Sequence, residues 1–179
     1  MVGQKSLLRY SNRTIWIHWV STVLIFGLIY TGIRMEHQAV SEHKFILYQI
    51  HFSLGILVFI STIIRIIALY RDAKPKNLYP KKSVRERVRK YVYYGFYISI
   101  IWMCMSGLIS LFLEGIIHSL QSSNWQDLPE ISADGFHPIM LSHHIMAKMI
   151  FLLLLFHICG FVLHLVQKKE NTLKRIWFN

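Results

Sequence analysis

One apolar stretch, residues 142–166, most constrains how this chain can fold, because it is long enough to cross a bilayer and carries His143, His144, His157 and His164. A spanning helix needs about 20 mostly apolar residues, and ionisable side chains in hydrocarbon are costly enough to indicate function. At 3.6 residues per turn, His143 and His157 lie within about 40° of one face and about 21 Å apart along the axis. His144 lies about 140° away from His157. One face of this helix therefore carries His143 and His157 near its two ends.

Three further apolar runs complete the pattern, and two of them carry a single histidine each, His18 and His51. The chain is 54% hydrophobic and 16% charged, which is typical of a small integral membrane protein. We expect an all-α membrane protein with one domain, residues 1–179, built as a four-helix bundle. The expected spans are residues 14–34, 45–69, 91–113 and 142–166, with Ser11 or Asn12 capping the first, and the last connection has room for a short surface helix.

The net charge of +11 is distributed as in a membrane protein rather than a nucleic-acid-binding protein. Of the 20 basic residues, three lie in residues 1–14, nine in residues 71–90 and four in the C-terminal tail. Six of the nine acidic residues lie in the two opposite loops. The positive-inside rule therefore predicts that both termini are cytoplasmic, and basic runs beside anionic lipid explain the charge without a nucleic-acid partner.

This topology predicts which histidines meet. Span one ascends and span four descends, so His18 and His157 lie together in the cytoplasmic half. Spans two and four both start outside, so His51 meets His143 in the outer half. Imidazole binds iron, copper and zinc, but two histidines without a carboxylate or thiolate suit six-coordinate haem, whereas zinc requires more ligands. The alternative is that they are ordinary hydrogen-bonded core histidines.

Other residues in the spans have two interpretations each. Arg65 lies 14 residues after His51 and either extends to the lipid headgroups or pairs with a haem propionate. Glycines 27 and 32 either pack helices closely or make room for a cofactor, and Gly55 would let a flat ring approach the backbone. The two cysteines, Cys104 and Cys159, lie in spans and form no CxxCH motif, so covalent c-type haem is not indicated.

These residues resemble the bacterial cytochrome b561 family of four-helix dihaem membrane proteins, over nearly the whole chain. The resemblance rests on the four histidines, on three companions of His51 and on a C-terminal motif: Ile17-His18-Trp19; Ile50-His51 with Ser53, Gly55 and Arg65; His143, His157 and His164; and residues 170–175, ENTLKR. It implies a multi-pass protein of the bacterial inner membrane with two non-covalent b haems, one ligated by His18 and His157 and the other by His51 and His143. It also implies electron exchange with the quinone pool.

The resemblance leaves the physiological activity open. One branch of the family looks like a superoxide oxidase, which passes electrons from superoxide to ubiquinone, while other relatives are cytochrome b subunits of hydrogenases and formate dehydrogenases. The outer loops contain two basic residues, Arg34 and Lys44, and six acidic residues, so their overall charge does not steer the superoxide anion to this surface. A redox partner protein is therefore the alternative, and a non-redox scaffold or metal transporter is a third interpretation.

Two more polar residues in span four are candidates for the same chemistry. His164 lies seven residues after His157 and so on nearly the same face, where it either assists a quinone and its protons or is an interface or propionate contact. Lys148, about 140° from His143, either extends to the headgroups or contacts an anion.

Overall fold

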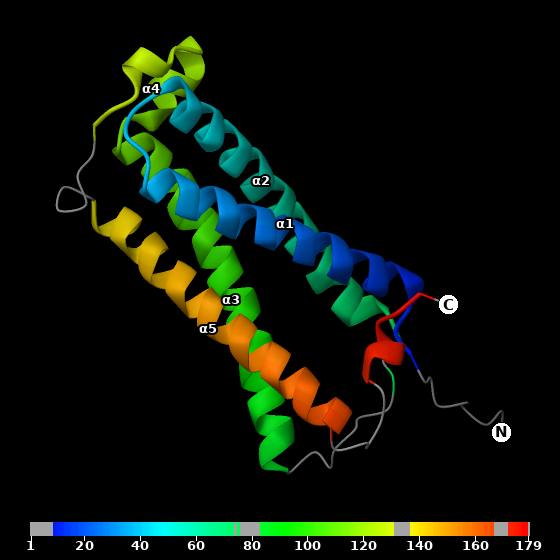
Figure 1. The fold of residues 1–179 in the computed structure, drawn as a ribbon. Helices are drawn as coiled ribbons and strands as arrows, with labels where there is room; N and C mark the ends of the chain where they lie inside the picture. Colours follow the sequence, from blue (N-terminus) through cyan, green and yellow to red (C-terminus); the bar gives the residue numbers. More distant parts are fainter. Residues whose placement is uncertain (1–8, 74, 76–82, 131–136, 167–171, 179) are drawn as a thin grey trace, which may run out of the picture.

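In a computed structural model, the chain folds entirely from helices over the residues that the structure describes, which are 9–73, 75, 83–130, 137–166 and 172–178. The helices, in chain order, are α1 (Asn12–Glu36), α2 (Glu42–Arg71), α3 (Val84–Leu113), α4 (Ile116–Ser122), η1 (Trp125–Asp127), α5 (Pro138–Val166) and η3 (Thr172–Arg175) (Figure 1). Here η denotes a 3-10 helix. The predicted all-α fold is confirmed.

Four of these helices, α1, α2, α3 and α5, are long and apolar enough to cross a membrane. Each of the four spans expected from the sequence lies within one of them, although α3 begins seven residues earlier, at Val84 instead of residue 91. The short helix expected in the last connection is α4. The chain is therefore a multi-pass membrane protein.

Serine side chains start three of the long helices. The hydroxyl oxygens of Ser11, Ser41 and Ser83 each accept a hydrogen bond from the backbone N–H three residues later. This bond satisfies one of the donors that a helix leaves unpaired in its first turn. Of the two caps expected for the first helix, Ser11 is the one that forms.

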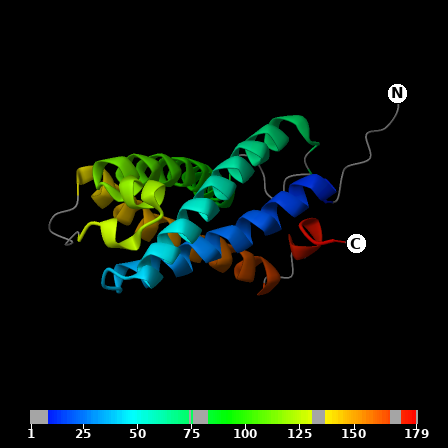
Figure 2. The same cartoon turned by 90° about the horizontal axis from the view of Figure 1, so that it is seen from above.

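The four long helices pack as two pairs, α1 along α2 and α3 along α5, with α2 also touching α3 (Figure 2). Small residues allow the close approach within pairs. Ser21 of α1 and Ser61 of α2 share a buried hydrogen bond of 2.6 Å. A Cβ on Gly27 would stand 3.1 Å from Leu54, so this glycine serves helix packing rather than a cofactor.

One end of the bundle, called the α4 end here, is closed by the connection after α3. Gly115 adopts a left-handed conformation (φ 73°), which glycine tolerates without strain, and α4 begins at the next residue. Leu111, Ile116 and Leu128 form a small buried cluster that packs against α2 residues. The connection therefore folds back over the bundle.

The opposite end, called the basic end here, holds the start of α1, the end of α2, the start of α3 and the C-terminal segment (Figure 1). The backbone N–H of Tyr10 donates to the carbonyl of Arg175, and Trp19 Nε1 donates to the carbonyl of Ile176 at 2.8 Å. Trp177 packs edge-on against Trp19. The C-terminal segment is thereby fixed to the start of α1.

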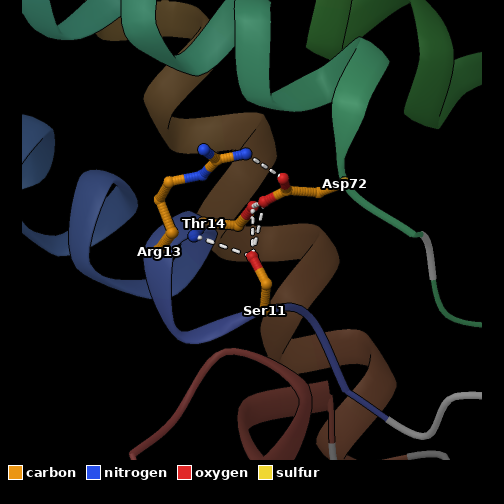
Figure 3. A network of polar contacts seen from close by, with 4 residues as sticks. All are labelled: Ser11, Arg13, Thr14 and Asp72. Atoms are coloured by element: carbon orange, nitrogen blue, oxygen red, sulfur yellow. Dashed lines mark hydrogen bonds and ion pairs between the residues drawn. The ribbon is translucent and has the colours of Figure 1, made fainter.

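A carboxylate joins α1 to α2 at this end (Figure 3). Asp72, which caps the C-terminus of α2, accepts hydrogen bonds from Ser11 at 2.5 Å and Thr14 at 2.8 Å, and forms an ion pair with Arg13. The hydrogen bonds from Ser11, Arg13 and Thr14 lower the pKa of Asp72 to about 2. The first turn of α1 and the end of α2 are therefore held together by one ionised group.

Candidate functional site

Two pairs of histidines face each other across the bundle, and each pair draws on two different helices. At the basic end, His18 of α1 and His157 of α5 have ring centres 6.4 Å apart. Towards the α4 end, His51 of α2 and His143 of α5 also have ring centres 6.4 Å apart. The structure therefore brings together the two pairs that the topology predicts. They are called the basic-end pair and the α4-end pair below.

The ring separation in both pairs fits one metal ion held between two imidazoles. With metal–nitrogen bonds of about 2.0–2.1 Å and each ring centre about 1.2 Å behind its nitrogen, the ring centres of two ligands lie about 6.4–6.6 Å apart. Within the described part of the chain, no group of three or more His, Cys, Asp or Glu side chains gathers to hold a metal. Two facing imidazoles, with the other positions supplied by a macrocycle, therefore match the donor set of a bis-histidine haem.

Hydroxyl groups hold both rings of the α4-end pair. Thr31 Oγ1 of α1 lies 2.8 Å from His51 Nδ1, and Ser106 Oγ of α3 lies 3.2 Å from His143 Nδ1. Thr31 and Ser106 are 4% and 2% exposed. Because Nδ1 of each histidine is engaged in this way, Nε2 is the nitrogen left to bind a metal.

Glycines border the α4-end pair as well. A Cβ on Gly107 of α3 would stand 3.0 Å from Cε1 of His143, and a Cβ on Gly32 of α1 would stand 3.6 Å from Cε1 of His51. At Gly55, one turn after His51, a Cβ would meet nothing within 4 Å. Gly107 therefore leaves the room that the His143 ring occupies, and Gly55 presents bare backbone where a flat ring would need it.

The basic-end pair has different neighbours. His18 packs against Trp19 with ring centres 5.5 Å apart, and His157 packs against Phe96 at 5.8 Å, nearly perpendicular. Arg65 of α2 is half-buried and is a charged neighbour of both histidine rings. Across the residues that the structure describes, no hydrogen bond engages either ring. Aromatic edges and one positive charge thus surround this pair.

The remaining residues singled out from the sequence do not join these pairs as ligands. The ring of His144 lies beside that of His143, 6.5 Å away, and not between His143 and His51. Lys148 and Arg34 are exposed, and Lys44 Nζ donates to the carbonyl of Gln38 at 2.7 Å. The side chain of His164, and residues 170–171 of the C-terminal motif, lie outside the described part of the structure.

Thr31 and Ser106 are the site residues that the sequence did not indicate. A hydroxyl in an apolar helix has many roles, most often a bond to a carbonyl of its own helix. Their partners, His51 and His143, lie on other helices, so no spacing along the chain marks the contact. The one available signal is that Thr31 directly precedes Gly32, a pair of small residues in an otherwise bulky stretch.

Four spanning helices with two facing pairs of intramembrane histidines define a membrane protein of the haem-binding, electron-carrying class. The chain belongs to the prokaryotic cytochrome b561 family, whose model matches residues 9–179 and so includes all four paired histidines. The resemblance inferred from the sequence is confirmed. The protein is a bacterial membrane cytochrome of the b type, which binds haem and transfers electrons. A comparison with curated protein sequences gives no match.

Proposed function

We propose that the chain binds two b haems, one between His18 and His157 and one between His51 and His143, and that it conducts electrons between the two ends of the bundle. The observation that carries this proposal is that both pairs present their ring centres 6.4 Å apart. The two ligands on α5, 14 residues apart, separate the two sites by about 21 Å along the helix.

Bound haem supplies one-electron chemistry, and two histidine ligands leave no open position for oxygen. The chain contributes the surroundings. Arg65 supplies a positive charge beside the basic-end pair, where it also suits the propionate of a haem. His164 remains a candidate for a quinone or propionate contact at the same end.

We propose that the basic end faces the cytoplasm across the bacterial inner membrane. The start of α1, the end of α2, the start of α3 and residues 172–178 lie at this end, and the sequence segments 1–14, 71–90 and 168–175 carry most of the basic residues, as cytoplasmic segments do. Electrons then exchange with ubiquinone in the membrane, and the α4 end faces outwards.

For the donor we propose superoxide, making the protein a superoxide:ubiquinone oxidoreductase. Two superoxide anions each lose one electron to become two molecules of oxygen, and one ubiquinone takes both electrons and two protons to become ubiquinol. The exposed guanidinium of Arg34 and the ammonium groups of Lys44 and Lys148 provide local positive charge on this half of the bundle.

A second function is favoured by the acidic residues of the same surface. Asp127 lies beside Ser122 and Asn124 at the tip of the α4 end, and Glu114 accepts a hydrogen bond from the backbone N–H of His137. Acidic residues at this end suit a docked protein with a basic surface better than a free anion. The chain would then be the cytochrome b subunit of a larger dehydrogenase or hydrogenase complex.

The deciding experiment mixes the purified, oxidised protein with a superoxide source and follows the haem absorbance, with a parallel sample given ubiquinol. Reduction by superoxide that added ubiquinone reverses supports the oxidase, provided that superoxide dismutase abolishes it. His51→Ala is the matched variant, because it breaks the α4-end pair and leaves the basic-end pair in place. Reduction by ubiquinol alone supports the subunit function, and a folded protein without haem bands contradicts the whole proposal.

A further inference from the structure

We propose that Thr31 and Ser106 are positioning residues for the α4-end site, each fixing the tautomer and the orientation of one histidine so that its Nε2 lone pair is presented to the metal. The inference deepens the proposed function and rests on the proposed haem ligation. It concerns two side chains that lie on helices which carry no ligand of this site, α1 and α3.

The direction of the hydrogen bond at Thr31 follows from its other partners. A threonine hydroxyl has one proton to donate, and Thr31 Oγ1 lies 2.9 Å from the carbonyl oxygen of Gly27, which only accepts. The hydroxyl proton is therefore directed to Gly27, and the oxygen accepts from His51 Nδ1–H at 2.8 Å. The carbonyl of Leu28 is a second acceptor near this ring. His51 is thereby held as the Nδ1–H tautomer.

The same reasoning applies at Ser106. Its Oγ donates to the carbonyl of Trp102 at 2.7 Å, one turn earlier in α3. Its oxygen then accepts from His143 Nδ1–H at 3.2 Å, and the carbonyl of Met103 is the second acceptor near this ring. Both hydroxyls are almost completely buried, so water does not compete for either bond.

All four spanning helices therefore build the α4-end site: α2 and α5 supply the ligands, and α1 and α3 supply the hydroxyls. Each ligand is held by a helix that packs closely against its own, α1 against α2 and α3 against α5. The planes of the two imidazole rings are set 64° apart. The basic-end pair, whose planes lie 55° apart, has aromatic neighbours in place of these hydroxyls.

A histidine whose Nδ1–H is hydrogen-bonded is a more basic and better oriented ligand, and loss of such a partner typically weakens metal binding or activity about 10–100-fold. Because the backbone carbonyls remain as acceptors, we expect the lower part of that range for Thr31→Val and for Ser106→Ala. A more basic ligand also stabilises oxidised iron, so losing the hydroxyl raises the midpoint potential of the α4-end haem. The angle between the rings also becomes less fixed.

The experiment compares Thr31→Val, which keeps the shape and removes the hydroxyl, with Thr31→Ser, which restores it, and with Ser106→Ala. Thr22→Val is the matched control, because Thr22 Oγ1 of the same helix donates at 2.8 Å to the backbone carbonyl of His18, not to an imidazole nitrogen. The readouts are haem content, redox titration and low-temperature EPR of the ferric protein. The largest g value of a bis-imidazole haem increases with the angle between its ring planes.

We expect Thr31→Val and Ser106→Ala to shift one EPR signal and raise one midpoint potential, with about tenfold weaker binding of one haem. The affected signal should be the one that His51→Ala removes, and Thr31→Ser and Thr22→Val should behave like the wild type. Two haems with unchanged signals in Thr31→Val and Ser106→Ala overturn this inference and leave the haem ligation intact. Two haems retained in the His51→Ala variant would overturn the proposed ligation, and this inference with it.

Discussion

The two histidine pairs have the same ring separation, 6.4 Å, but they are held by different kinds of contact. At the α4 end, buried hydroxyls of Thr31 and Ser106 engage the ring nitrogens. At the basic end, the aromatic rings of Trp19 and Phe96 flank the histidines, and a half-buried arginine lies close to both. The same ligand geometry is thus built once with directional bonds and once with packing and charge.

This difference gives the electron path a direction under the proposed function. Reduction adds a negative charge to a haem, so the positive charge of Arg65 stabilises the reduced state at the basic end. Hydrogen bonds that make His51 and His143 more basic stabilise the oxidised state at the α4 end. Electrons then pass downhill from the α4 end to the basic end.

The largest effect is expected from the ligands themselves. His143→Ala and His51→Ala should each remove the α4-end haem, and His18→Ala and His157→Ala should each remove the basic-end haem, because one imidazole cannot complete a bis-histidine site. Haem content should fall from two per chain to one, measured as haem per protein after purification. The two groups of variants should lose different EPR signals.

His144→Ala is the control for this comparison, since His144 adjoins His143 in α5 but is not placed between the paired rings. It should keep both haems. Two haems in His143→Ala would mean that His144 replaces its neighbour as the ligand and would contradict the pairing described here.

Gly107→Ala should disturb the α4-end site alone. Its new Cβ would stand 3.0 Å from Cε1 and 3.3 Å from Nδ1 of His143, so the ring must shift away from α3 and from the hydroxyl of Ser106. We expect about tenfold weaker binding of the α4-end haem, as for loss of the partner that orients a ligand. Gly95→Ala in α3, where the Cβ would stand 3.2 Å from the side chain of Leu153 in α5 instead of from a histidine, is the control. Equal haem content in both variants would show that the His143 ring adapts freely.

The main features of the fold and the pairing of histidines were accessible from the sequence, because both depend on regular quantities. Hydropathy gives the spans, and 3.6 residues per turn sets His143 and His157 on one face of α5. Topology then assigns His51 and His18 as their partners, since His51 lies inside the span that shares its starting end with α5, and His18 lies near the start of a span that runs the opposite way.

The contacts that orient the ligands were not accessible in this way. The bond between Thr31 and His51 depends on how α1 and α2 are rotated against each other, and the approach of Gly107 to His143 depends on the packing of α3 on α5. Neither of these helix–helix arrangements can be predicted from the spacing of residues along the sequence. Asp72 is a similar case, since its partners in the first turn of α1 lie about 60 residues earlier in the chain.

A smaller effect is expected at the basic end from Arg65→Gln. Removing the positive charge should cost the reduced haem roughly 1 kcal/mol of electrostatic stabilisation at an effective dielectric constant near 20. This energy lowers the midpoint potential of the basic-end haem by about 40 mV for one electron. Redox titration should show the α4-end haem unchanged. Arg87→Gln, which removes an exposed charge from the first turns of α3, should change neither potential. A shift confined to the α4-end haem in Arg65→Gln would reverse the assignment of charge to the two sites.

The smallest effect is expected from Asp72→Asn, which loosens the basic end without touching a ligand. The folded-state pKa of Asp72 lies at about 2, below its ordinary value of 3.8, because Ser11, Arg13 and Thr14 hydrogen-bond to the carboxylate. A lowered pKa means that the ionised group stabilises the folded state above about pH 4, and that this contribution is lost as the pH falls towards 2. Near pH 6 the variant should therefore unfold a few degrees below the wild type.

The pH dependence tests the cause. As the wild-type carboxyl becomes protonated, the difference in unfolding temperature between wild type and Asp72→Asn, followed by circular dichroism in detergent, should shrink as the pH falls towards 2 and vanish only below it. Asp72→Asn should also weaken retention of the basic-end haem, since His18 lies only one to two turns beyond Ser11 and Thr14 in α1. Asp127→Asn, which alters a carboxylate at the α4 end, is the control and should leave retention of the basic-end haem unchanged. A difference that persists undiminished at pH 2 would mean that the ionised carboxylate is not what joins α1 to α2.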